Sequence, residues 1–194
     1  MRTLLMLIAL SSSLTTALAW AEQPVNPRMT ANIDGSGQGF QGNLMINQSA
    51  GDQQQQANAR AISIGDHAST RITVRQTNDR SAPSALDAHA RINGAAFSQG
   101  NGVLGVNQSA GIANQQINAF RLELNALPES LDDSALAQSA APATNSGVGV
   151  PQGGERVVEM DDQAFAGSRG VVQLNQSAGV GNRSANNLSI RVLE

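Results

Sequence analysis

The chain has 194 residues, a net charge of -3, no cysteine and only 3% aromatic residues. The absence of cysteine excludes disulfides and thiolate chemistry, and the scattered arginines form no basic patch for nucleic acid or an anionic membrane. So few large apolar side chains leave a thin hydrophobic core, because each buried one contributes only about 1.5–3 kcal/mol. Gly, Asn, Gln, Ser and Ala are abundant instead, a bias typical of either disorder or stacked β-structure.

Residues 1–21 are typical of a secretory signal peptide, which we expect to be helical. Arg2 supplies a positive start, residues 4–10 an apolar run and residues 19–21 a small-x-small cleavage site. No later stretch approaches the roughly 20 apolar residues that a membrane-spanning helix needs. We therefore expect export without an integral membrane span, and a short N-terminal tail at residues 22–32.

The rest of the chain contains one unit three times. The pentapeptide Asn-Gln-Ser-Ala-Gly begins at Asn47, Asn107 and Asn175, and the sequences around the three copies align without a gap. Copies of this kind predict one structural unit that stacks on itself. We expect the repeats at residues 33–64, 92–124 and 160–194.

Apolar residues alternate on both sides of each pentapeptide. In the second copy they are Leu104 and Val106 before it, and Leu122 and Leu124 after it. A period of two indicates strands, so each unit is predicted to be a β-arch or hairpin, which is marginal alone in water and needs neighbours. The predicted fold is all-β, with three imperfect repeats stacked as β-arches in solenoid-like, cross-β layers.

Residues 65–91 and 125–159 are predicted to be flexible linkers. The second is rich in Ala, Ser, Pro and Gly without any period, and we expect it to be disordered. Phe97 and Phe165 lie equally far ahead of their repeats, whereas the first copy has Gly37 at that position.

Stacking at the roughly 4.7 Å spacing of paired strands would place equivalent residues in columns. An amide side chain carries both donors and an acceptor, so aligned amides bond along a column as a ladder. The predicted ladder residues are Asn47, Asn107 and Asn175, then Gln48, Gln108 and Gln176, and then Asn58, Asn118 and Asn186. A shifted register would leave buried amides unpaired at about 1–3 kcal/mol each. A partial ladder of Gln55 with Gln115 is expected to be broken by Arg183.

Gly51, Gly111 and Gly179 are expected at the bend after the first strand, where only glycine takes a positive φ without steric cost. The alanine before each glycine is expected inside the arch. Neither terminal repeat carries a Pro, Lys or helix that would block its edge, so both ends of the stack are expected to template another chain.

Other chemistry is weakly indicated. The pentapeptide also begins an N-glycosylation sequon, and its Asn and Ser are common in turns. His67 and His89 lie in the first predicted linker, where we expect them to be exposed to solvent. No catalytic, metal or cofactor site is predicted, and the chain is expected not to be an enzyme; a surface adhesin or a β-solenoid enzyme is the remote alternative.

The segments GVNQSAGIANQQINA and INQSAGDQQQQANARAIS closely resemble the repeat of the pseudomonad Fap functional-amyloid system. Fibre subunits of that system carry a signal peptide and three imperfect repeats joined by variable linkers, and the resemblance covers about residues 33–192. It implies a protein that passes through the periplasm, crosses the outer membrane by a dedicated pore and polymerises into cross-β fibres. Such fibres support biofilm and adhesion.

The major fibre subunit of that system carries a Cys-x-Cys motif, and this shorter chain has no cysteine. The resemblance therefore implies a minor subunit or a nucleator. The alternative is a periplasmic, chaperone-like accessory protein that binds the fibre subunit through the shared repeat. The implied partners are further copies, other repeat-bearing subunits and the pore.

Overall fold

The computed structural model of the chain describes residues 26–66, 68–78, 85–124, 139–140 and 153–193. This part is all-β, as the sequence predicts, and it contains no helix. The predicted signal helix lies outside the described residues, as do His67 and most of the second predicted linker.

Each repeat contributes three strands. Repeat 1 contains β1 (Arg28–Asp34), β2 (Gln41–Ala50) and β3 (Gln55–Ile64). Repeat 2 contains β5 (Asp87–Asn93), β6 (Asn101–Ile112) and β7 (Gln115–Leu124). Repeat 3 contains β9 (Arg156–Met160), β10 (Arg169–Val180) and β11 (Arg183–Val192). The short strands β4 (Arg75–Gln76) and β8 (Ser139–Ala140) pair with each other.

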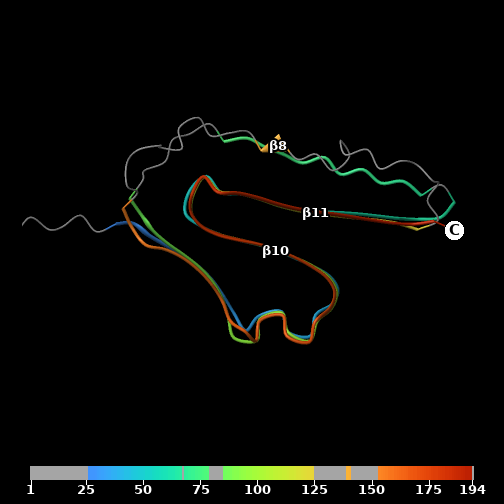
Figure 1. Cartoon of the computed structure of the whole chain (residues 1–194), viewed down its shortest axis with the longest axis horizontal. Helices are drawn as coiled ribbons and strands as arrows, with labels where there is room; N and C mark the ends of the chain where they lie inside the picture. The colour runs from blue at the N-terminus through green and yellow to red at the C-terminus, as the bar shows by residue number, and fades with distance from the viewer. Residues whose placement is uncertain (1–25, 67, 79–84, 125–138, 141–152, 194) are drawn as a thin grey trace, which may run out of the picture.

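Equivalent strands of the three repeats form three parallel sheets, in the orders β1-β5-β9, β2-β6-β10 and β3-β7-β11. Each repeat is therefore one layer, repeat 2 is the middle layer, and repeats 1 and 3 are the end layers. Figure 1 looks along the stack, so the three traces overlie one another. Consecutive strands of a repeat belong to different sheets, which makes each unit an arch rather than a hairpin.

The sheet of β1, β5 and β9 is missing from the sequence prediction, and its strands lie partly in the predicted tail and linkers. The inward residues of β5 are Ala88, Ala90 and Ile92. Two of the three are small, so the alternation of apolar and polar residues along this strand is weak. The strands also share only part of their sequence: β1 has Ala31 and Ile33 opposite Ala90 and Ile92, whereas β9 has Val158 and Met160 there. The paired part of each repeat thus begins before the predicted boundary.

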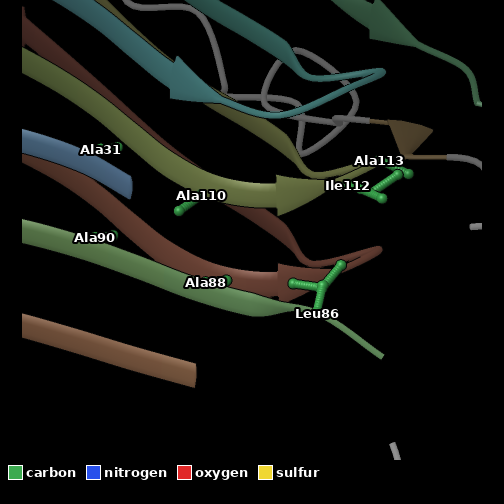
Figure 2. Packing of buried hydrophobic residues seen from close by; sticks show 7 residues of the cluster. All are labelled: Ala31, Leu86, Ala88, Ala90, Ala110, Ile112 and Ala113. Carbon is green, nitrogen blue, oxygen red and sulfur yellow. The ribbon is translucent and has the colours of Figure 1, made fainter. Parts of the chain in front are cut away.

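A small apolar cluster lies between this sheet and the sheet of β6. Figure 2 shows its buried members, which are Ala31, Leu86, Ala88, Ala90, Ala110, Ile112 and Ala113. The pentapeptide alanine therefore packs against β5, and its expected place inside the β6–β7 arch is wrong. Side chains alternate along a strand, and Asn107 and Ser109 already occupy the face of β6 that looks at β7.

A second cluster packs Phe97 with Ile92, Leu104 and Val106. The rings of Phe97 and Phe165 stack with their centroids 5.3 Å apart. A Cβ added at Gly37 would lie 2.6 Å from the Phe97 ring, so glycine in the first copy leaves room for the phenylalanine of the second.

Candidate functional site: the amide ladders

The space between β6 and β7 is filled by polar side chains. Asn107, Gln116 and Asn118 are at most 1% exposed, and each lies on the face of its strand that looks into this space. A buried amide without partners is costly, so every one of these groups has to find hydrogen bonds inside the stack.

The first asparagine column runs through all three layers. Asn107 Nδ2 donates to Asn47 Oδ1 at 2.9 Å, and Asn175 Nδ2 donates to Asn107 Oδ1 at 2.9 Å. Asn107 also donates to the carbonyl of Ala57, and Asn175 donates to that of Ile117. The side chains thus tie β6 both to its neighbouring layer and to the opposite sheet.

A second column lies on the facing strands. Asn118 Nδ2 donates to Asn58 Oδ1 at 3.0 Å, and Asn186 Nδ2 donates to Asn118 Oδ1 at 3.1 Å. The two columns are linked, because Asn118 Nδ2 also lies 3.1 Å from Asn107 Oδ1. The result is one network of amides across the interface of two sheets.

The glutamine column faces the other way, toward β5. Gln108 Nε2 donates to Gln48 Oε1 at 2.8 Å, and Gln176 Nε2 donates to Gln108 Oε1 at 2.9 Å. Gln108 is fully buried and also donates to the carbonyl of Arg91. Asn and Gln at adjacent positions therefore fasten one strand to both neighbouring sheets, since successive side chains point to opposite faces.

The partial ladder of Gln55 and Gln115 continues into repeat 3, contrary to the prediction. Gln115 Nε2 donates to Gln55 Oε1 at 2.9 Å, and Arg183 Nε donates to Gln115 Oε1 at 2.8 Å. Arginine has no amide group, but its guanidinium still supplies the donor that the column needs, so the chain of hydrogen bonds continues.

Gly51, Gly111 and Gly179 have positive φ values of 106°, 118° and 125°. Gly111 and Gly179 nevertheless lie within the paired strands β6 and β10. A Cβ on Gly111 would be 1.9 Å from the carbonyl oxygen of Gly179, so close backbone approach requires glycine here. The left-handed residues of the bend itself come two positions later and were not predicted: they are Gln53, Ala113 and Gly181.

A buried charged group was also missed by the sequence prediction. Glu123 is 1% exposed; its carboxylate accepts hydrogen bonds from Thr70 and pairs with Arg191 at 2.8 Å. Burial raises the pKa of this carboxyl, but the bonds from Thr70 and the charge of Arg191 outweigh it, so the net pKa is lowered. Segment 68–77 thereby covers the outer face of β7, where Arg121 also donates to Thr70.

One further side chain differs from expectation, and another was not considered in the sequence prediction. His89 is 6% exposed within β5, so its expected exposure in a loop is wrong. Arg60 of the first layer reaches into the second and donates to the carbonyl of Val103 at 2.8 Å. A Cβ on Gly105 would collide with this guanidinium, whose pKa is lowered by burial.

Parallel, in-register layers joined by Asn and Gln ladders define a cross-β protein of the amyloid type. The chain belongs to the functional amyloid protein FapB/FapC family, whose model matches residues 14–193. No solved structure matches the chain. Over the residues described, no helix has the length and apolar character needed to cross a membrane.

Membership of this family makes the protein a functional-amyloid component. The family is one of structural amyloid proteins rather than enzymes. It implies a secreted, extracellular fibre in which the chain associates with fibre subunits.

Proposed function

We propose that the chain is a minor or nucleating subunit of the fibre, and that the ladder residues set the register of its layers. On this proposal it reaches the cell surface through the periplasm and an outer-membrane pore, and the fibre supports biofilm and adhesion. The supporting observation is that the amide columns run without interruption from one end layer to the other.

The nucleating role is supported by the number of layers that one chain supplies. A single chain brings three layers already in register, so a template needs no encounter between separate chains. Among the described strands of the three repeats, those of repeat 2 alone are paired on both sides, and those of repeats 1 and 3 are edges. Among the described residues, every large apolar side chain that stays exposed lies in or directly after a strand of repeat 1 or 3. Exposed strand edges of this kind recruit further strands.

To test this, the purified chain without the expected signal peptide is incubated in two ways. One sample contains the chain alone, and the other also contains a repeat-bearing fibre subunit. A nucleating subunit forms thioflavin-positive fibres alone and shortens the lag of the partner at substoichiometric amounts. A chain that stays monomeric yet changes the partner's lag is instead the periplasmic accessory protein of the alternative.

A further inference from the structure

We propose that copies of this chain join head to tail, with the repeat 3 face of one chain receiving the repeat 1 face of the next in the same register as the layers within a chain. This proposal rests on the proposed function as a fibre subunit. It adds the partner, the two contacting faces and the residue pairs at the junction.

The amide columns have a direction. In the Asn47, Gln48 and Asn58 columns, each nitrogen donates toward repeat 1 and each oxygen accepts from the side of repeat 3. The repeat 1 face therefore presents donors and the repeat 3 face presents acceptors. Two like faces would oppose donor to donor or acceptor to acceptor, so only unlike faces continue the ladder. The bond from Gln56 to Gln116 runs the other way, and its column ends at Ser184 of repeat 3.

A glycine column gives the same order. A Cβ on Gly102 would lie 1.9 Å from the carbonyl oxygen of Gly42, and one on Gly170 would lie 2.1 Å from that of Gly102. A Cβ on Gly42 meets nothing within 4 Å in the single chain. In the head-to-tail stack it would point at the Gly170 carbonyl of the preceding chain, at the same short distance.

The shapes and charges of the two faces also match. A shallow hollow lies between residues 172–174 of β10 and 185–188 of β11. Met45, which is 47% exposed, occupies the same column as Gln173 of that hollow and would cover it from the next chain. In another column Glu155 would meet Arg28, repeating the contact of Arg28 with Asp87 within the chain.

One column opposes like charges, because Asp161 would lie next to Asp34. The Asp161 carboxylate already accepts hydrogen bonds from the backbone of Gly94 and Gln163, which offsets part of this repulsion. An interface between unlike faces that continues the parallel, in-register stacking of the layers adds each chain along the same axis, so it generates a filament rather than a ring or dimer.

Cysteine pairs test the junction, because the chain has no cysteine of its own. Gln41 and Arg169 are exposed and both pair with Asn101, from opposite sides. Within one chain they are roughly 9–10 Å apart, too far for a disulfide, but in the head-to-tail stack they are neighbours. Fibres of the double variant Gln41→Cys, Arg169→Cys are oxidised, dissolved in denaturant and run without reductant.

We expect a ladder of covalent multimers from the double variant and none from either single variant. Disulfide-linked dimers of a single variant would mean that like faces meet. Fibres of the double variant that contain no covalent multimers would mean that the chains stack in another register. Either result would overturn the proposed head-to-tail junction. If the wild-type chain forms no fibres, the proposed function fails as well, so the two failures are distinguishable.

A second arm uses the glycine column. Gly42→Ala should slow fibre elongation at least tenfold, since its methyl group blocks the next chain. Gly39→Ala is the matched control: it also lies in repeat 1 at a positive φ with nothing within 4 Å, and it would face Gly167, which has no side chain. Equal elongation rates of the two variants would overturn the proposal.

Discussion

Replacing Asn107 with alanine removes the central link of the first asparagine column. Its side chain donates to Asn47 and to the Ala57 carbonyl, and accepts from Asn118 and Asn175. Each neutral hydrogen bond contributes about 0.5–1.5 kcal/mol, so losing four of them would cost at most about 6 kcal/mol of fibre stability.

The expected loss is smaller because most of the partners keep another bond. Asn47 Oδ1 still accepts from Asn58, Asn175 Nδ2 still donates to the carbonyl of Ile117, and Asn118 Nδ2 retains its own ladder bond. We therefore expect Asn107→Ala to cost about 2–3 kcal/mol, the contribution of roughly two buried hydrogen bonds.

The assay is the concentration of soluble protein that remains at equilibrium with fibres. A loss of about 2–3 kcal/mol per chain raises this concentration roughly 30- to 150-fold, since 1.4 kcal/mol is a factor of ten. Asn101→Ala is the matched control, because it makes the same chemical change at an exposed position of the same strand. Soluble concentrations within threefold of each other for the two variants would refute the ladder as a source of stability.

Other predictions concern the glycines, the buried carboxylate and the end layers. Gly111→Ala places a methyl group against the Gly179 carbonyl and should cost roughly 3 kcal/mol or more in fibre stability, whereas Gly181→Ala should cost only about 1–2 kcal/mol, because its methyl group meets nothing within 4 Å and Ala113 holds the same bend position at φ 59°; equal denaturant midpoints would contradict this. Because the Glu123 pKa is lower in the folded state, its stabilisation is present above about pH 4.3 and is lost as the pH falls through the folded value. Denaturant titrations should therefore show a weaker acid dependence for Glu123→Gln than for the wild type, and parallel pH profiles would remove Glu123 from the explanation. Asn47→Ala should destabilise the fibre as much as Asn107→Ala, since an end layer of the single chain becomes interior in the stack; a persistently milder effect in soluble-protein measurements would argue that repeat 1 stays at a free end.

The sequence predicted the strands and columns that repeat and missed those that do not. The period of two and the pentapeptide identify β6 and β7, because the same side chains recur in all three copies. β5 has a weaker signal: its Ala88 and Ala90 are small, and the alanine and isoleucine that it shares with β1 are replaced by Val158 and Met160 in β9. The bend was placed two residues early, since only Gly181 among its left-handed residues has the conformational preference that marks a turn.

The buried side chains of Glu123 and His89 were missed for a related reason. Glu123 is held by Thr70, which belongs to a non-repeated segment that no pattern brings to β7. His89 was assigned to a linker because the strand that contains it was not recognised. Side chains whose partners lie outside the repeat cannot be found from its period.

The central claim is that each chain supplies three successive layers, and a single spin label tests it most directly. Asn101→Cys gives one exposed labelling site in repeat 2 of a chain without other cysteines. Three layers per chain place identical labels about 14 Å apart along the fibre, so the spectrum should show dipolar broadening without exchange narrowing. A single exchange-narrowed line, which requires identical residues roughly 4.8 Å apart, would mean one layer per chain and would contradict the account.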